Sequence, residues 1–463
     1  MIVMKFGGTS LADAACLRQV AALLAEPSSQ PCVAVVSAAS GVTDLLLATG
    51  QLAAAGAEGE VEANLSRLRQ REHNMASEGI KEETLRSEVV AEVDALLASL
   101  ARVCTGVTLL GELSPRSQDL IASFGEKLSA TLLAGVLRDR GIRASAISTE
   151  GLVVTDEVFG AASPLMAPTT RNLRARLLPM LEQGIVPVLT GFIGSTAEGV
   201  TTTLGRGGSD YSASLVGSSL DADEVWIWTD VDGVMTADPR LVPSAQSLPE
   251  VSYAEAAELS YFGAKVIHPR TVIPTVEKGI PLRVKNTFNP GFPGTLIHQV
   301  GSPAEHVVKA ITSIRNLSLV SVEGAGMMGV PGVAARVFGA VARRNVSVLM
   351  ISQASSEHSI CFVVPEAAAE AVVRDLKEEL ARELERGDIS SIHARQGAVI
   401  VAAVGEGMRG TLGVAGRLFS ALGRAGVNVM AIAQGSSELN ISLVVDGSAE
   451  RAAVAAIHEE FIG

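Results

Sequence analysis

The segment Lys5–Ser10 reads Lys-Phe-Gly-Gly-Thr-Ser and follows an apolar run, which predicts a glycine-rich turn between a strand and a helix. Two glycines let the backbone approach a polyanion closely, and the N–H groups at a helix start point toward such a ligand. Lys5 could reach a transferring phosphoryl group. Because no GxxxxGK(S/T) motif occurs, this is not the common phosphate-binding loop. An ordinary βα turn with a solvated lysine is the alternative.

A second glycine-rich segment, residues 201–210, reads Thr-Thr-Thr-Leu-Gly-Arg-Gly-Gly-Ser-Asp. The pattern predicts a strand that enters a glycine turn and then a helix capped by Ser209 or Asp210. Arg206, on the turn, suits a bidentate contact with a carboxylate or a phosphate. The alternative is a surface arginine beside a plain helix cap.

Two further motifs lie downstream. Trp228–Val234, followed by Asp238–Arg240, comes at the carboxyl end of an expected strand, where open α/β sheets bind ligands. Phe262–Pro269 places Lys265 where a helix should break at proline. Taken individually, these motifs are only a turn and a helix end.

Short Val/Ile-rich runs alternate with longer helical patterns over about residues 1–300, which predicts a doubly wound α/β domain with a mostly parallel sheet. The turn-rich segment Asn286–Gly294 and the loop at 301–303 mark its expected end. The expected strands are Ile2–Phe6, Cys32–Ser37, Ile185–Phe192 and Val225–Val231.

The remainder contains an internal repeat with a constant offset and no gap, in which Gly324 matches Gly405 and Gln353 matches Gln434. Each copy predicts a strand, a glycine-rich turn, an amphipathic helix, a strand, a polar turn and a strand. Chance is a poor explanation for this register, so we infer a duplication. The two copies define expected domains at 306–391 and 392–463.

The composition limits the class of protein. A net charge of −13 argues against nucleic-acid and anionic-membrane partners, because attraction to polyanions needs a basic field. The four cysteines lack metal-ligand spacing and suit buried thiols in a reducing cytosol. No signal segment is evident, and no stretch approaches the roughly 18 apolar residues of a membrane span. We therefore expect a cytoplasmic protein.

Six motifs in this order resemble the aspartate kinase family, within the wider amino-acid-kinase superfamily. They read KFGGTS, VSAASGVTDLL, FGEKLSA, TTTLGRGGSD, WTDVDGV with DPR, and FGAKVIHP. The repeat looks like the tandem ACT-type βαββαβ regulatory domains of these enzymes. The detailed sequence is most similar to the kinase portion of bifunctional aspartate kinase–homoserine dehydrogenases, without the dehydrogenase. The resemblance covers nearly the whole chain.

The resemblance implies transfer of the γ-phosphoryl group of ATP to the side-chain carboxylate of aspartate, with Mg²⁺ carried in by ATP. It assigns the transferring phosphoryl group to Lys5, Gly7, Gly8 and Asp210. It makes Arg206 the clamp for the α-carboxylate and Glu126 the partner of the α-ammonium. The rest of the substrate lining implied by the resemblance is Ser37, Thr43, Ser209 and Asp210.

The nucleotide side implied by the resemblance includes Lys5 and Gly8, and it continues with Thr229, Asp230, Met235, Arg240 and Lys265. Arg240 and Lys265 would face the β- and γ-phosphates. Met235 departs from the family, which usually has tyrosine there. Methionine can still pack on a purine, because contacts between sulfur and aromatic rings are favourable. The hydroxyl contact is lost, so nucleotide affinity or selectivity is in question.

The polar turn of each repeat reads Gln-x-Ser-Ser-Glu. Its amide and hydroxyls suit an amino-acid effector, for which the resemblance favours threonine over lysine. The expected contacts are Gln353, Ser356, Gln434 and Ser437. A purely structural role in the sheet interface is the alternative. Pairing of ACT-type sheets also implies a homo-oligomer, built from dimers.

Two other functions compete with this interpretation. A kinase for glutamate, acetylglutamate or a nucleotide would not be expected to combine FGAKVIHP with duplicated ACT-type repeats. A non-catalytic amino-acid sensor with an inactive kinase fold is the second. The presence of Lys5, Glu126, Arg206 and Asp210 argues against it.

Overall fold

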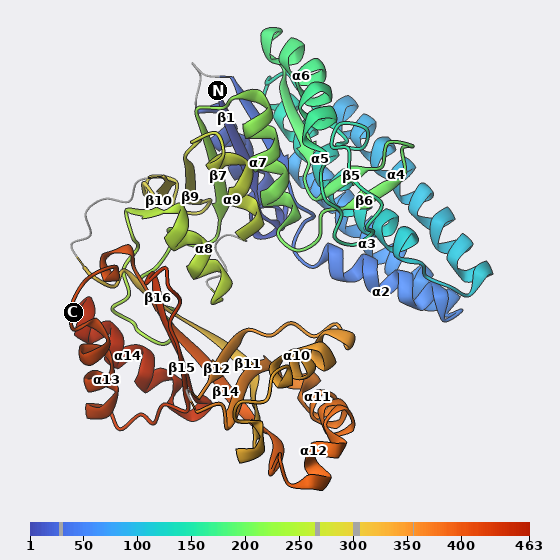
Figure 1. The fold of residues 1–463 in the computed structure, drawn as a ribbon. Coiled ribbons are helices and arrows are strands. Elements are labelled where there is room, and N and C mark those ends of the chain that lie inside the picture. Colours follow the sequence, from blue (N-terminus) through green and yellow to red (C-terminus); the bar gives the residue numbers. More distant parts are fainter. Residues whose placement is uncertain (27–30, 264–268, 300–305, 355) are drawn as a thin grey trace. The chain divides into compact units, whose positions relative to one another are not determined.

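The computed structural model describes residues 1–26, 31–263, 269–299, 306–354 and 356–463 (Figure 1). These residues form two compact units, neither of which is continuous in sequence. The first unit comprises Met1–Val234, Pro249–Tyr253 and Val266–Val300. The second unit comprises Met235–Leu248, Ala254–Lys265 and Gly301–Gly463. The last division between the units falls at Val300/Gly301, close to the expected boundary, whereas Met235–Leu248 and Ala254–Lys265 group with the second unit. The loop expected at 301–303 lies outside the described residues, and the boundary near residue 300 stays a prediction.

The first unit contains an eight-stranded sheet in the order β3-β4-β2-β1-β7-β9-β10-β8. Its pairs are parallel except that β10 runs antiparallel to β9. The strands are β1 (Ile2–Phe6), β2 (Cys32–Val36), β3 (Ala144–Ile147), β4 (Val186–Thr190), β7 (Glu224–Thr229), β8 (Glu250–Ser252), β9 (Leu282–Asn286) and β10 (Thr295–His298). A small hairpin, β5 (Ile193–Ser195) with β6 (Thr201–Thr203), lies apart from this sheet.

The register of the central strands brings their carboxyl ends to one edge. Phe6 lies opposite Val36 on one side and opposite Trp228 on the other. Strands buried on both faces are continuous apolar runs, as β2 is, and this explains why they could be recognised in the sequence. The turns that follow β1, β2 and β7 therefore meet at the same edge.

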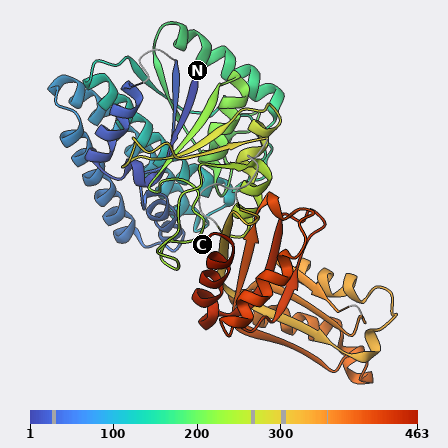
Figure 2. The same ribbon diagram turned by 90° about the vertical axis from the view of Figure 1, so that its left-hand side faces the viewer.

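Helices cover both faces of the sheet (Figures 1 and 2). Helix α5 packs on β2, β3 and β4, whereas α7 packs on β1, β2 and β7. The helices of this unit are α1 (Ala14–Ala25), α2 (Val42–Ala54), α3 (Glu58–Gly79), α4 (Glu83–Leu110), α5 (Pro115–Asp139), α6 (Met166–Glu182), α7 (Gly208–Leu220) and α9 (Pro269–Val276). A large core cluster lies between the sheet and helices α1 to α5.

Helices α4 and α5 are long and apolar enough, by length and composition, to cross a membrane, which differs from the expectation that no stretch comes near this limit. Most of α5 is buried inside the fold. Helix α4 buries one stripe, including Val89, Val93 and Leu97, and packs against α5. Core helices of globular domains have the same composition, so these two helices are weak grounds for a membrane role.

The second unit contains a six-stranded antiparallel sheet in the order β12-β13-β11-β14-β16-β15. Its strands are β11 (Ala310–Glu323), β12 (Met350–Gln353), β13 (Ser359–Pro365), β14 (Ser391–Val404), β15 (Ala431–Ala433) and β16 (Asn440–Asp446). Its helices are α10 (Val333–Arg343), α11 (Glu366–Glu379), α12 (Ala381–Arg386), α13 (Val414–Arg424) and α14 (Glu450–Phe461). Helix α8 (Tyr253–Tyr261) also belongs here from Ala254 onward.

The two repeats share their longest strands. The first half of β11 pairs with the second half of β14, next to β16, and the second half of β11 pairs with the first half of β14, next to β13. Accordingly, Ile311 joins the core of the second repeat and Ile392 joins the core of the first. The repeats are interleaved, and the expected boundaries at 306, 391 and 392 stay a prediction about domains.

The segment Met235–Leu248 is built into the second repeat. Its residues Ala237, Leu241 and Val242 belong to the same core cluster as Leu418. The hydroxyl of Thr236 lies 2.9 Å from Nε2 of the buried His458. This part of the chain therefore depends on α13 and α14 for its packing.

Helix α8 is attached to the same repeat by buried polar contacts. The amine of Lys309 donates to the carboxylate of Glu255 over 3.0 Å, and both side chains are nearly excluded from solvent. Glu255 also accepts the backbone N–H of Glu406. A buried ion pair needs such additional hydrogen bonds, because desolvation of the two charges opposes their attraction.

Candidate active site

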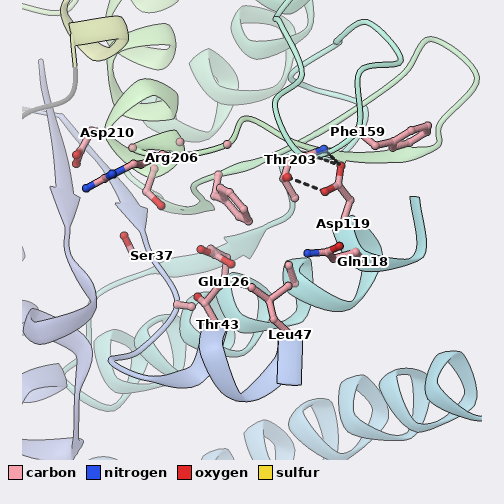
Figure 3. Close-up of a pocket in the computed structure, with 18 of the residues that line it drawn as sticks. Ser37, Thr43, Leu47, Gln118, Asp119, Glu126, Phe159, Thr203, Arg206 and Asp210 are labelled. Atoms are coloured by element: carbon pink, nitrogen blue, oxygen red, sulfur yellow. Dashed lines mark hydrogen bonds between the residues drawn. The ribbon is translucent and has the colours of Figure 1, made fainter. Parts of the chain in front are cut away.

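A cavity of about 570 Å³ lies at the carboxyl edge of the first unit's sheet (Figure 3). It is formed by the ends of β1 and β2, the starts of α2 and α7, and one face of α5. Seven residues predicted from the sequence line it together: Lys5, Ser37, Thr43, Glu126, Arg206, Ser209 and Asp210. Motifs that lie far apart in the chain therefore form one site.

The glycine-rich turn after β1 approaches neighbouring backbone closely. A Cβ on Gly8 would lie 2.8 Å from the carbonyl oxygen of Ala38, so this position requires glycine. The N–H of Ser40 donates to the carbonyl of Gly8, and the N–H of Gly7 donates to the carbonyl of Trp228. These contacts join the turn after β1 to the ends of its two neighbouring strands.

Lys5 and Asp210 form an ion pair inside the cavity. The amine nitrogen of Lys5 lies 2.6 Å from Oδ1 of Asp210, and the two side chains are 12% and 16% exposed. Asp210 is in the first turn of α7, whose N-cap is Gly207 with φ 73° and no side-chain cap. The predicted cap by Ser209 or Asp210 is therefore wrong, because the left-handed glycine ends the turn and Asp210 faces Lys5 instead.

Glu126 is the buried acid of the cavity, with 3% of its surface exposed. Burial raises the pKa of its carboxyl to about 8, although a backbone hydrogen bond at Ala38 and the charge of Lys5 act in the opposite direction. Its Oε2 atom is buried and has no hydrogen-bond partner among the described residues. A buried acceptor without a partner is costly, so this oxygen is suited to a donor from a bound ligand.

Arg206 lies on the turn between β6 and α7. Gly205 and Gly207 on either side of it both have positive φ, which presents the arginine at the cavity. Its side chain is exposed and makes no ion pair with any residue in the described part of the chain. The cavity therefore offers cations for two anionic groups and a buried acceptor for one ammonium group.

The structure adds residues to this site that the motifs did not indicate. The positions missed include Leu47, Pro115, Gln118, Asp119, Phe159 and Phe192. Asp119 precedes Glu126 by two helical turns, and this spacing on one helix face could have revealed it. Phe192 has φ 66°, a strained conformation for a bulky residue, and the sequence carries no signal for it.

The predicted nucleotide residues are distributed over both units. Thr229 ends β7, and its hydroxyl donates to Asp230 over 3.2 Å. Met235 and Arg240 belong to the second unit, where Arg240 is largely exposed and forms an ion pair with Asp238. Lys265 lies outside the described residues. A nucleotide site formed by these residues stays a prediction.

Among the predicted effector residues, Gln353 lines a second cavity of about 380 Å³ in the first repeat. Glu357 lines the same cavity, has φ 57°, and accepts the backbone N–H of Gly329 over 2.9 Å. Ser356 is hydrogen-bonded to His358. Sequence reasoning missed Glu357 as a residue that fixes this turn.

The second repeat has the equivalent hydrogen bond from a glycine N–H to the glutamate of its polar turn. Glu438 has φ 56° and accepts the N–H of Gly410 over 2.7 Å. Gln434 follows directly after β15, and Ser437 is exposed in the same turn. The internal symmetry seen in the sequence therefore extends to the hydrogen bonds of the turns.

Comparisons with known proteins agree with this architecture. Residues 1–286 match the amino acid kinase family, and residues 320–380 and 401–461 each match the ACT domain. A solved structure of E. coli aspartokinase III in complex with aspartate and ADP has a TM-score of 0.82 at 30% identity and covers 99% of both chains. A second structure of that enzyme, in complex with lysine and aspartate, has the same TM-score at 31% identity and covers 100% of both chains.

Curated relatives fall into two groups. Bifunctional aspartokinase/homoserine dehydrogenase 2 of Arabidopsis thaliana is 37% identical over 99% of this chain, which spans about half (50%) of that relative's length. Aspartokinase 1 of the same plant is 32% identical over 99% of this chain and 80% of the relative. An amino acid kinase fold joined to ACT domains is the class that these matches define. Within that class, the chain belongs to the aspartokinases.

Proposed function

We propose that the protein is an aspartate kinase, which transfers the γ-phosphoryl group of MgATP to the β-carboxylate of L-aspartate and yields 4-phospho-L-aspartate. The observation that carries this proposal is the composition of the main cavity. It combines the amine of Lys5 with the buried oxygen of Glu126 and the guanidinium of Arg206, neither of which has a partner in the described part of the chain. These groups complement the ammonium and the carboxylates of aspartate.

The chemistry requires little acid–base catalysis from the protein. The nucleophile is a carboxylate, which is ionised near neutral pH, so no general base is needed. Phosphoryl transfer instead needs positive charge and aligned donors around the phosphoryl oxygens. Lys5, held by Asp210, would supply that charge, and the backbone at Gly7 and Gly8 would supply N–H donors. Mg²⁺ enters with the nucleotide as part of the substrate.

Aspartate would be held at its two ends. Glu126 would accept hydrogen bonds from the α-ammonium, while Arg206 would bind the α-carboxylate in a bidentate manner. Ser37, Thr43 and Ser209 complete the polar lining. E. coli aspartokinase III, a structural relative of this chain, has been solved with aspartate and ADP bound.

The nucleotide would contact the residues that the resemblance assigns to it. Thr229 and Asp230 would lie on its side of the site, next to the turn after β1, because β7 is the neighbour of β1 in the sheet. Met235 would pack on the purine, while Arg240 and Lys265 would bind the β- and γ-phosphates. Arg240 would have to leave its ion pair with Asp238 to bind phosphate. Arginine forms charge-assisted hydrogen bonds with either anion, so this change of partner is feasible.

We further propose feedback inhibition by an end-product amino acid, with threonine favoured and lysine second. This assigns the reaction to the first step of lysine, threonine and methionine biosynthesis. The cavity beside Gln353 and Glu357 supports an effector site, because it offers an amide and a carboxylate to a small zwitterion. E. coli aspartokinase III has been solved with lysine and aspartate bound.

The assembly would be a homodimer or a dimer of dimers, because ACT domains pair their sheets between chains. The location expected from the sequence, the cytoplasm, is part of the same proposal. The plant relatives carry names that place them in the chloroplast.

The activity is tested by trapping the acyl phosphate with hydroxylamine. Purified protein with ATP, Mg²⁺ and aspartate should form aspartyl hydroxamate, and reactions without ATP should form none. Glutamate and acetylglutamate, offered in parallel, test the neighbouring kinase activities. A protein that binds amino acids but forms no hydroxamate would instead be a sensor with an inactive kinase fold.

A further inference from the structure

We propose that Asp119 is a positioning residue that holds the Arg206 turn at a fixed separation from Glu126, and thereby sets the length of dicarboxylic amino acid that the cavity accepts. The inference rests on the proposed function, because it concerns how the distance between Arg206 and Glu126 selects the length of the amino-acid substrate. It assigns a role to a buried carboxylate that the phosphoryl-transfer chemistry leaves unused.

Asp119 connects three segments of the first unit (Figure 3). It is 3% exposed. Its Oδ2 atom accepts the backbone N–H groups of Gly160 and Thr203, each over 2.9 Å. Its Oδ1 atom accepts the hydroxyl of Thr203 over 2.8 Å. Among the described residues its hydrogen bonds all come from neutral donors, Gly160 and Thr203.

The helix that carries Asp119 also carries Glu126. The two residues are two turns apart on α5, so they share one face and lie about 10 Å apart along the axis. Both line the cavity, and α5 is a long core helix. Helix α5 therefore fixes the position of the ammonium-binding group relative to Asp119.

The Arg206 turn begins at the residue that Asp119 holds. Thr203 ends β6, and Arg206 follows three residues later. The carbonyl of Thr203 accepts the N–H of Ala162, and a Cβ on Gly205 would lie 3.0 Å from the carbonyl oxygen of Gly160. Asp119 thus holds β6 and the loop at Gly160 against each other, and the Arg206 turn leaves from that junction.

Removal of the carboxylate would leave donors of Thr203, which is 1% exposed, buried without an acceptor. The end of β6 would then move to reach water or another acceptor. Arg206 would move with it, whereas Glu126 would not, because it is on the helix. That movement would weaken the binding of aspartate more than the binding of an amino acid with one more methylene, such as glutamate.

The test compares Asp119→Ala and Asp119→Asn with the wild-type chain. Asp119→Ala should raise KM for aspartate by about 10- to 50-fold and leave KM for MgATP within about twofold, because it disturbs one end of one substrate. The preference for aspartate over glutamate in kcat/KM should fall by about tenfold. Asp119→Asn should recover most of the loss, since its side-chain oxygen accepts the backbone N–H groups and its amide can donate to the Thr203 hydroxyl.

Glu150→Ala is the matched control. Glu150 accepts the hydroxyl of Thr201 over 2.7 Å, at the other end of β6, and does not line the cavity. This variant should lower thermal stability without a selective change in KM for aspartate. A double-mutant cycle between Asp119→Ala and Thr203→Val should show that the two effects on aspartate binding are not additive.

Two results would overturn the proposal. One is a lower melting temperature for Asp119→Ala with wild-type KM and wild-type selectivity against glutamate. The other is an equal rise in KM for aspartate and for MgATP. Calorimetric titration with aspartate tests the same point without turnover, since Asp119→Ala should bind aspartate more weakly than Glu150→Ala does. Absence of hydroxamate from the wild-type chain would overturn the proposed function separately.

Discussion

The amine of Lys5 and the carboxylate of Asp210 lie 2.6 Å apart and join the end of β1 to the first turn of α7. The pair is nearly buried, so the lysine is held at a fixed point rather than moving freely in solvent. A positive charge beside a helix start is suited to the oxygens of a transferring phosphoryl group. We therefore infer that Asp210 holds the positive charge of Lys5 in position before the substrates bind.

Removal of the positive charge of Lys5 should abolish most of the turnover. Lys5→Met is expected to lower kcat by about 10³-fold, because it removes electrostatic stabilisation of the transition state. Hydroxamate formation at saturating aspartate and MgATP measures the loss. Lys127→Met is the matched control: Lys127 is 15% exposed and lies 2.9 Å from Glu150, but it is outside the cavity lining. Wild-type turnover by Lys5→Met would rule out the proposed mechanism.

The pH dependence of aspartate binding should report Glu126. With a pKa of about 8, its carboxyl is protonated in the empty site at pH 7, and the ammonium of aspartate favours the ionised form. Binding should therefore release a proton below pH 8. KM for aspartate should fall as pH rises, by up to about tenfold per unit, and level off above pH 8.

Calorimetry of aspartate binding at pH 7 in two buffers with different ionisation enthalpies measures the released proton directly. Glu126→Gln should bind aspartate weakly and show no such release. A KM that is independent of pH between 6 and 8 in the wild-type enzyme would contradict the assignment of Glu126.

A second buried acid should make stability depend on pH. Glu72, on α3, is 2% exposed, and its Oε1 has no hydrogen-bond partner among the described residues. Burial raises the pKa of this carboxyl from 4.5 to about 7. The folded chain therefore keeps a proton that the unfolded chain loses, so the free energy of unfolding should fall as pH rises from 4.5 to 7.

Glu72→Gln should remove this loss and stabilise the protein by about 1–3 kcal/mol at pH 8, as judged by urea unfolding. At pH 5 the variant and the wild type should differ little, because the acid is then neutral in the fold. Equal destabilisation of the variant at both pH values would show that the carboxylate has a partner that it needs.

The effector assignment predicts separate outcomes for the two repeats. Gln353→Ala should raise the effector concentration for half-inhibition by about tenfold, since a hydrogen bond from the side-chain amide contributes roughly 1–1.5 kcal/mol. Gln434→Ala tests the equivalent turn of the second repeat. Turnover should be measured with threonine, lysine, methionine, and threonine with lysine. Unchanged inhibition of both variants would remove these turns from the effector site.

Much of the site followed from local patterns. The strand Ile2–Phe6 has the bounds predicted for it, and the other predicted strands differ by one or two residues at one or both ends. Lys5 and Arg206 line the same cavity, Lys5 from the end of β1 and Arg206 from the glycine turn between β6 and α7. Such turns are encoded by residues next to one another in sequence, and they can therefore be recognised without the fold.

Contacts between distant segments could not be predicted in this way. The link between Asp119 and Thr203 depends on how β6 meets α5, and no motif spans both. The interleaving of β11 with β14 was hidden as well, since two equal repeats do not reveal which halves of their strands pair. The helix cap at Asp210 was mispredicted because its alternative partner, Lys5, lies far from it in the sequence.

The segment Met235–Leu248 has a practical consequence for anyone who wants to divide this chain. It lies inside the amino acid kinase match, yet Ala237, Leu241 and Val242 pack in the second repeat's core. A truncated protein that stops near residue 300 would leave those apolar side chains exposed to water and prone to association. In a chimaera of two aspartokinases, this segment and α8 should therefore come from the same protein as the ACT domains against which they pack.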